Sequence, residues 1–191
     1  MNVEAICQDN PNLKADGSFV IWRENKLNYY FGDDEIIYVP SYVEVIGSKC
    51  FRDKNKIKCV ILPEGCKVIE EYAFTGCISL QYINLSEVVV IGDNAFRCCT
   101  SLKHVYCTRL ETLGKYAFAE SALENVSFVN LRMVSEYAFF GCYNLKSFIA
   151  PKLVSLKNYA FMNISYLTFV VSAAVLLPRC AFSKTNVTYQ L

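Results

Sequence analysis

The chain has 191 residues, of which 53% are hydrophobic and 19% are charged. This composition excludes an extended disordered chain and favours a single domain with a large buried core. The 19 basic and 18 acidic residues leave a formal net charge of +1, which argues against a nucleic-acid partner because phosphate backbones attract strongly basic surfaces.

The N-terminus lacks the features of a secretory signal. Residues 1–8 include Glu4 and have neither a basic start nor an apolar stretch after it. We therefore expect a cytoplasmic protein, with the cell surface as the alternative. A local basic cluster at residues 52–58 is interrupted by Asp53, and we interpret it as a solvated edge.

A small residue followed by phenylalanine recurs seven times along the chain. The phenylalanines are Phe51, Phe74, Phe96, Phe118, Phe139, Phe161 and Phe182. They are separated by 23, 22, 22, 21, 22 and 21 residues, a period within the range of leucine-rich repeats. One such repeat cannot bury its apolar face alone, so the repeats are expected to stack as about seven rungs of a solenoid.

Two apolar columns precede these phenylalanines. The first column stands five residues before each Phe: Ile46, Ile69, Ile91, Leu113, Val134, Leu156 and Leu177. It lies four residues before the small residue, a spacing that places both side chains on one helical face. Each repeat is therefore predicted to contain a short helical or 3₁₀ turn. The second column, eight residues before each Phe, is also expected to point inward.

A strand pattern follows most of these phenylalanines. The frame L-x-x-I-x-L occurs at residues 80–85, 102–107, 123–128, 145–150 and 167–172. Its last apolar pair alternates with exposed positions at period two, which predicts strands stacked into a parallel sheet. The uncharged residues 160–178 fit this register as core, because polar residues interrupt them and they fall short of a membrane-spanning helix.

Residues 61–77 carry the pattern I-L-P-E-G-C-K-V-I-E-E-Y-A-F-T-G-C, which resembles the BspA-like leucine-rich repeat. The resemblance covers about residues 36–187, and later repeats lose the glycine and cysteine of the pattern. It implies an α/β solenoid over residues 36–191, with a parallel sheet on the concave face and short helical turns on the convex face. It also implies that residues 1–35 form a lead-in, in which residues 19–32 make a hairpin-like cap.

The ten cysteines do not form a zinc pattern, because the chain has no C-x-x-C and a single histidine, His104. Most cysteines stand at or beside core columns, where Cys behaves as a small hydrophobe. We expect free buried thiols, with a disulfide between Cys77 and Cys99 as the alternative, and no metal or other cofactor. No nucleophile arrangement surrounds His104, so the chain is not expected to be an enzyme.

The predicted functional surface is the concave sheet face, which is neutral and partly aromatic. Its expected binding residues are Ile61, Tyr82, Asn84, His104, Tyr106, Asn125 and Phe169. Tyrosines suit protein recognition, so a protein partner is the first hypothesis, and the family resemblance implies adhesion at a cell surface. The alternatives are an intracellular scaffold and a self-assembling protein, since an open edge near residues 187–191 would allow a weak end-to-end dimer in place of a monomer.

Overall fold

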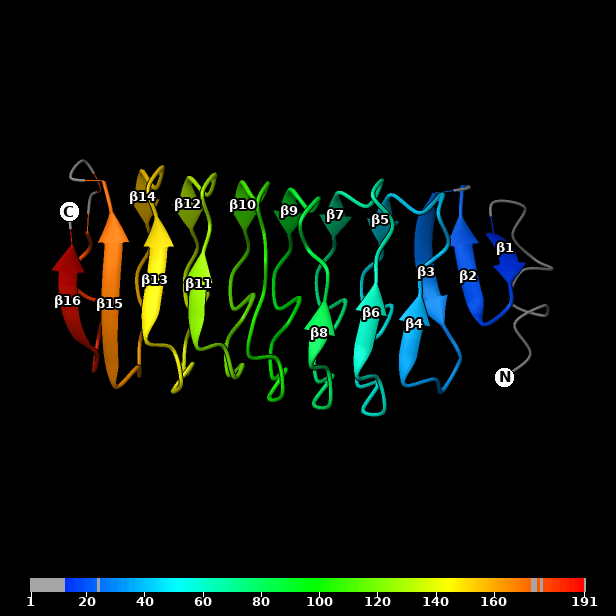
Figure 1. The fold of residues 1–191 in the computed structure, drawn as a ribbon, viewed down its shortest axis with the longest axis horizontal. Helices are drawn as coiled ribbons and strands as arrows, with labels where there is room; N and C mark the ends of the chain where they lie inside the picture. The colour runs from blue at the N-terminus through cyan, green and yellow to red at the C-terminus, as the bar shows by residue number, and fades with distance from the viewer. Residues whose placement is uncertain (1–12, 24, 173–174, 176, 191) are drawn as a thin grey trace.

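The computed structural model describes residues 13–23, 25–172, 175 and 177–190. These residues form a solenoid of about seven turns, stacked along the long axis of the molecule (Figure 1). They contain sixteen strands and no helix. No segment among them can therefore cross a membrane as an apolar helix.

Nine strands form one sheet, here called the back sheet, whose strands from β5 to β14 lie behind the front strands in Figure 1. In order across the sheet they are β1 (Leu13–Asp16), β2 (Phe19–Trp22), β3 (Lys26–Tyr30), β5 (Val45–Ile46), β7 (Val68–Ile69), β9 (Val90–Ile91), β10 (Thr112–Leu113), β12 (Met133–Val134) and β14 (Ser155–Leu156). The strands from β3 to β14 are parallel, whereas β1, β2 and β3 pair antiparallel.

The remaining strands form two parallel sheets on the opposite side of the coil, here called the front face. One sheet contains β4 (Ile36–Tyr38), β6 (Cys59–Ile61) and β8 (Tyr82–Ile83). The other contains β11 (Asn125–Ser127), β13 (Ser147–Ala150), β15 (Tyr166–Val171) and β16 (Asn186–Gln190). The prediction of stacked parallel strands is confirmed.

The predicted helical turns are wrong. The column that begins with Ile46 and Ile69 instead provides the two-residue strands of the back sheet, in which Ile46 pairs with Ile69. β-Branched residues such as Val45 and Ile46 favour this extended backbone. Between each strand and its Phe the chain makes tight turns, and a left-handed residue such as Tyr72 (φ 58°) interrupts any helix. Two residues four positions apart, such as Ile69 and Ala73, therefore belong to separate segments and not to one helical turn.

The seven phenylalanines form the spine of the core. From Phe51 to Phe182 their rings stack in sequence order, with neighbouring centroids 4.9 to 5.8 Å apart. Six of the seven rings are fully buried, and Phe182 in the last turn is half-buried. Because each ring contacts the rings of the turns before and after it, the spine couples adjacent repeats.

Each of the first six turns places two residues in the left-handed region, two positions before and two positions after its Phe, and the last turn places only Lys184 there, two positions after Phe182. In the turn of Phe139, for example, Tyr137 has φ 58° and Gly141 has φ 66°. Only Gly76 and Gly141 among the positions after Phe are glycines, so most turns use a residue with a side chain there. Such residues are strained by about 1 kcal/mol relative to glycine.

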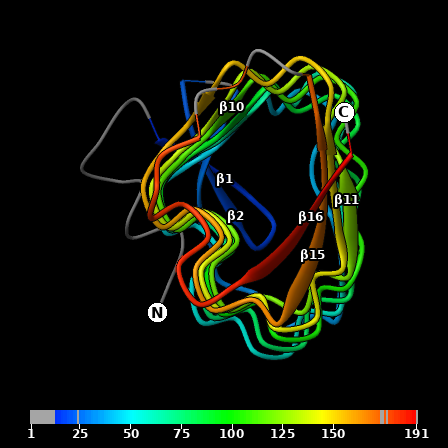
Figure 2. The same ribbon diagram turned by 90° about the vertical axis from the view of Figure 1, so that its left-hand side faces the viewer.

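The N-terminal end of the coil is covered by β1 and β2, which lie across its far end in Figure 2. Val20 and Ile21 of β2 are buried, and Tyr30 of β3 packs on Phe51 with ring centroids 5.3 Å apart. These strands therefore continue the aromatic spine beyond the first repeat. The boundary at residues 35 and 36 stays a prediction.

Candidate protein-binding face

The front face presents two columns of outward side chains. Strand register and burial place the following residues in the first column: Ile36, Cys59, Tyr82, His104, Asn125, Ser147, Thr168 and Thr188. The second column contains Tyr38, Ile61, Asn84, Tyr106, Ser127, Ile149, Val170 and Gln190. Between them runs an inward column that includes Ile37, Val60 and Ile83, which are buried.

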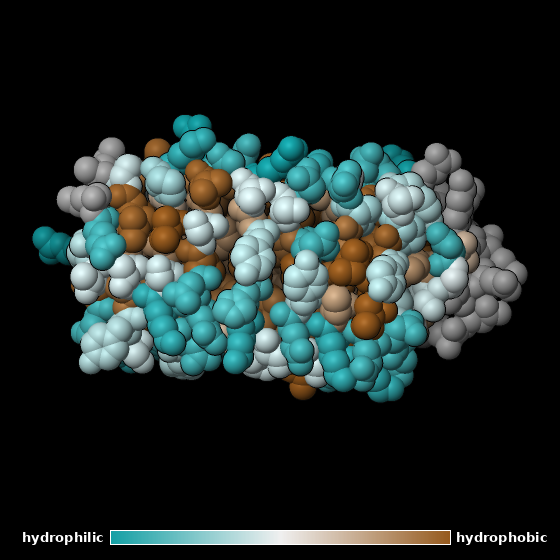
Figure 3. Space-filling model, viewed as in Figure 1, coloured by the Kyte–Doolittle hydropathy of each residue, from teal (hydrophilic) through white to brown (hydrophobic). Residues whose placement is uncertain are grey.

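Neither outward column contains an aspartate, glutamate, lysine or arginine. The two columns carry three exposed tyrosines, of which Tyr38 is 71% exposed, Tyr82 46% and Tyr106 69%. Figure 3 shows apolar side chains gathered over β4 and β6 and again over β13 and β15, with a hydrophilic margin below them. A surface that is depleted of charge and carries large aromatic side chains has the composition of a protein interface.

Most of the predicted binding residues do lie on this strip. Tyr82, His104, Tyr106 and Asn125 are exposed, and Ile61 is half-buried. Tyr82 and His104 belong to the first column and Tyr106 to the second, so these three residues lie on adjacent turns near the middle of the front face. Whether they contact a partner stays a prediction.

Asn84 lies on the same strip, but its side chain already has backbone partners. Its Oδ1 accepts a hydrogen bond from the Leu62 amide at 2.6 Å, and its Nδ2 donates to the Leu62 carbonyl at 2.9 Å. The Asn84 side-chain amide thus takes the place of the backbone hydrogen bonds between β6 and β8 at the point where β8 ends. We expect Asn84 to support the sheet more than to contact a partner.

The prediction that Phe169 faces outward is wrong. Phe169 is fully buried and pairs with the buried Phe148, and its ring stacks on that of Phe148 with centroids 5.3 Å apart. The segment between Phe161 and this strand is one residue shorter than in the preceding turn, so the alternation of inward and outward positions shifts by one. Thr168 and Val170 take the outward positions instead.

Ile36 and Tyr38 are strip residues that the sequence pattern did not identify. They belong to β4, which pairs with β6 one turn later, so that Tyr38 aligns with Ile61. A signal for them was present: the sequence Tyr38-Val-Pro has the same form as Ile61-Leu-Pro, an outward residue followed by an aliphatic residue and proline.

The two front sheets are separated at residues 103–107, which are not assigned as a strand. Beside this break lies a pocket of about 460 Å³, lined by Gln81, Thr100, Ser101, Lys103 and His104. No carboxylate lines it, and no hydrogen bond joins His104 to either hydroxyl in the described structure. The arrangement lacks the oriented base that nucleophilic catalysis requires.

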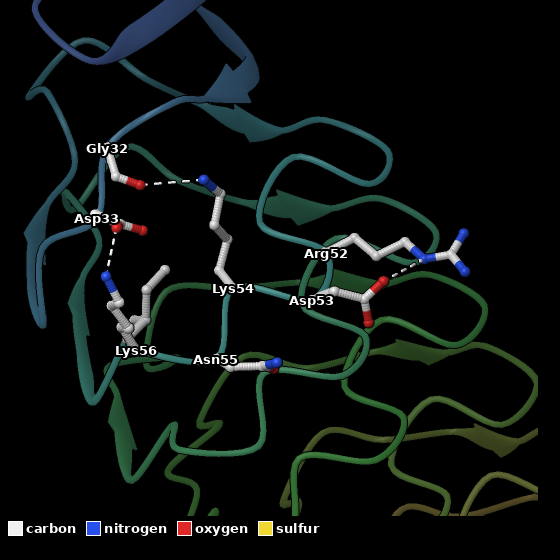
Figure 4. Close-up of a pocket in the computed structure, with 8 residues that line it drawn as sticks. Gly32, Asp33, Arg52, Asp53, Lys54, Asn55 and Lys56 are labelled. Atoms are coloured by element: carbon white, nitrogen blue, oxygen red, sulfur yellow. Dashed lines mark hydrogen bonds and ion pairs between the residues drawn. The ribbon is translucent and has the colours of Figure 1, made fainter.

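Residues 52–57 of the basic cluster line a second pocket, of about 350 Å³ (Figure 4). The cations in it already have partners. Lys54 donates to the Gly32 carbonyl at 3.1 Å, Lys56 pairs with Asp33 at 2.5 Å, and Arg52 pairs with Asp53 at 3.3 Å. This agrees with its interpretation as a solvated edge. Within the described residues, no group of three or more metal-ligating side chains is present.

The repeat architecture agrees with a match to a known family. A family model described as the BspA type leucine rich repeat region, in six copies, matches residues 28–130 and 111–189. The chain belongs to the BspA-type leucine-rich repeat family. Leucine-rich repeats of this kind are typically non-enzymatic modules for protein interaction, since solenoids offer extended binding surfaces. No curated protein matches the sequence.

Several solved structures share this fold at low sequence identity. A leucine rich cell surface protein from Faecalibacterium prausnitzii is 22% identical, with a TM-score of 0.78 over 95% of this chain and 55% of that one. A leucine-rich repeat protein from Eubacterium ventriosum is 19% identical, with a TM-score of 0.76 over 95% of this chain and 52% of that one. The pneumococcal vaccine antigen PcpA is 18% identical, with a TM-score of 0.71 over 96% of this chain and 49% of that one. The chain spans about half the length of these three proteins.

Proposed function

We propose that this chain is a non-enzymatic protein-binding module whose front face binds a protein partner. The observation that carries the proposal is the strip of two outward columns without acidic or basic side chains, on which Tyr38, Tyr82 and Tyr106 are exposed. Such rings supply large contact area at low entropic cost, with a hydroxyl available for hydrogen bonding.

We place the module at a cell surface, as an adhesin-like protein. The support is the similarity to the Faecalibacterium prausnitzii protein, which is described as a cell surface protein. The cytoplasmic location expected from residues 1–8 has no support from the comparisons. Labelling of intact cells with a membrane-impermeant reagent tests the location, and an unlabelled protein would contradict it.

The binding face can be tested with two sets of variants on a panel of immobilised extracellular and surface proteins. The first replaces Tyr38, Tyr82 and Tyr106 with alanine, and the matched control replaces Tyr29, Tyr72 and Tyr143, which lie outside the strip. We expect the first set to lose at least tenfold in affinity for any protein that the wild type captures, and the control to retain it. Retained binding by the first set would refute the face, provided that circular dichroism shows both sets folded.

Self-association is a second candidate, which β16 supports. No described strand pairs with its outer edge, and unpaired strand edges can add a strand from another chain. Light scattering at several protein concentrations tests this, because an end-to-end dimer dissociates on dilution. A mass that stays monomeric at every concentration would exclude it.

A further inference from the structure

Three tyrosines form a stacked ladder at the edge of the solenoid, outside the front face. Tyr116, Tyr137 and Tyr159 each stand two residues before the Phe of their turn. The Tyr116 and Tyr137 rings lie 4.7 Å apart between centroids, with 1° between their planes. The Tyr137 and Tyr159 rings lie 5.0 Å apart at 18°.

The backbone fixes these rings in place. All three residues are left-handed, with φ of 54°, 58° and 60° for Tyr116, Tyr137 and Tyr159. The Tyr116 amide donates to the Glu136 carbonyl at 3.2 Å, and the Tyr159 amide donates to the Cys180 carbonyl at 3.2 Å. Hydrogen bonds between one turn and the next therefore hold the tyrosine rings of adjacent turns close together. Only a small movement of the side chains is needed to bring two phenol rings into contact.

The ladder is half-buried and reaches solvent, unlike the phenylalanine spine inside it. The tyrosine rings cover one another. The Arg97 guanidinium lies 5.5 Å from the Tyr116 ring centroid, and Phe140 packs on Tyr137 in a T-shaped arrangement with ring centroids 6.1 Å apart. Tyr72 occupies the same position two turns before Tyr116, but Asn94 stands between them in the column. Tyr72 thus has a cationic environment from Lys49 and Arg52 and no stacked phenol within the described structure.

We propose that the tyrosine ladder is a site of oxidative cross-linking, at which Tyr137 couples to Tyr116 or Tyr159 as dityrosine. The oxidant is hydrogen peroxide acting through a haem peroxidase. Each phenol loses its hydroxyl hydrogen atom, and the two phenoxyl radicals join through a bond between their ring carbons ortho to oxygen. The hydrogen on each joined carbon then moves to its own oxygen, which restores both phenols, and the two abstracted hydrogen atoms reduce the peroxide to two molecules of water.

The cross-link would staple neighbouring turns of the solenoid. A repeat protein depends on contacts between adjacent turns, so a covalent bond between two turns restricts the unfolded chain across one whole repeat. By analogy with a disulfide that closes a loop of similar length, we expect the melting temperature to rise by roughly 5–10 °C. A protein exposed to peroxide would in this way gain stability from its own oxidation.

The test treats dilute protein with a haem peroxidase and hydrogen peroxide, and follows dityrosine emission and intact mass. We expect a monomer that lacks two hydrogen atoms, and a proteolytic fragment in which Tyr137 is joined to Tyr116 or Tyr159. The variant Tyr137→Phe, which keeps the ring stack, should lose this intrachain product. The matched variant Tyr72→Phe should form it as the wild type does.

Three results would overturn the proposal. One is an equal intrachain yield in Tyr137→Phe, and another is dityrosine found only between chains, through exposed residues such as Tyr38 and Tyr106. The third is no dityrosine at all while free N-acetyltyrosine in the same mixture is coupled. Unchanged melting temperatures of the untreated variants would show that a lost product reflects lost chemistry and not lost folding.

Discussion

The Cys99 thiol donates a hydrogen bond to the carbonyl oxygen of Phe74, one turn earlier, with a sulfur–oxygen distance of 3.2 Å. The same bond recurs along the solenoid between Cys77 and Phe51, Cys142 and Phe118, and Thr185 and Phe161. The column three residues after each Phe therefore does more than fill space, because its donors add side-chain hydrogen bonds to carbonyl groups of the preceding turn, three of which also accept a backbone amide.

This bond predicts a difference between two substitutions of similar size. Cys99→Thr should retain a side-chain donor to the Phe74 carbonyl, as Thr185 does for Phe161, whereas Cys99→Val should leave that carbonyl with the Cys77 amide as its one remaining donor in the described structure. We expect the valine variant to be less stable than the threonine variant by about 1 kcal/mol. Urea unfolding followed by circular dichroism measures the difference, and equal midpoints would contradict a role for the thiol as donor.

The phenylalanine spine should be most sensitive at its centre. Phe96 is fully buried between Phe74 and Phe118, with ring centroids 5.2 Å from each, so Phe96→Ala removes stacking on both sides. We expect a loss of about 3–5 kcal/mol. Phe182 is half-buried at the last turn, and Phe182→Ala should cost clearly less. Equal losses in equilibrium unfolding would show that the spine does not act through adjacent turns.

The left-handed positions predict substitutions of opposite sign. Gly141 has φ 66° and Lys184 has φ 56° at the equivalent position of the last turn. Gly141→Ala introduces a Cβ into the left-handed region, 3.4 Å from the Glu120 side chain, and should lower the free energy of unfolding by about 1 kcal/mol. Lys184→Gly relieves such strain and should leave stability equal or raise it by about 0.5–1 kcal/mol. Thermal melts of both variants test the pair.

The buried thiols predict a loss of stability in alkali. Burial raises the pKa of Cys66 and of Cys77 from 9.0 to about 12. Above pH 9 these thiols ionise in the unfolded chain but stay protonated in the folded one, so stability is full below pH 9 and is lost as the pH rises toward 12. Each such thiol steepens the decline by about 1.4 kcal/mol per pH unit. In Cys66→Val the free energy of unfolding should fall less steeply with pH. Urea unfolding at several pH values between 9 and 11 measures this, and the same pH dependence in the variant and the wild type would count against a contribution from this thiol.

The sequence predicts the solenoid well because its strongest signals are periodic. Residue pairs such as Ala73 and Phe74 recur with little change in spacing, and the front strands follow them at fixed distances. The spacing of Ile69 and Ala73 predicts a helical turn where the structure has a back strand, because a spacing of four residues does not reveal the tight turn that separates the two. Two-residue strands stabilised by neighbouring turns leave no periodicity of their own to recognise.

The candidate site was predicted less completely than the fold, for a related reason. Which side chains face outward depends on strand register, and one missing residue before β15 moved Phe169 from the surface into the core. Tyr38 lies outside the predicted strip because its strand precedes the first small-Phe pair, from which the repeat pattern is counted. Pairing between turns decides both positions, and a single sequence shows this only through small changes in repeat length.

Asn84 distinguishes a structural role on the front face from a binding role. Asn84→Ala removes both hydrogen bonds to Leu62, so we expect stability to fall by about 1–3 kcal/mol. Asn84→Asp keeps an acceptor for the Leu62 amide but places a carboxylate beside the Leu62 carbonyl, so it should also destabilise the fold. Leu62 lies beside β6, where the ladder to β8 ends, and amide hydrogen exchange at Leu62 should therefore accelerate in both variants. Unchanged exchange and stability, together with weaker partner capture, would instead show that Asn84 serves the partner directly.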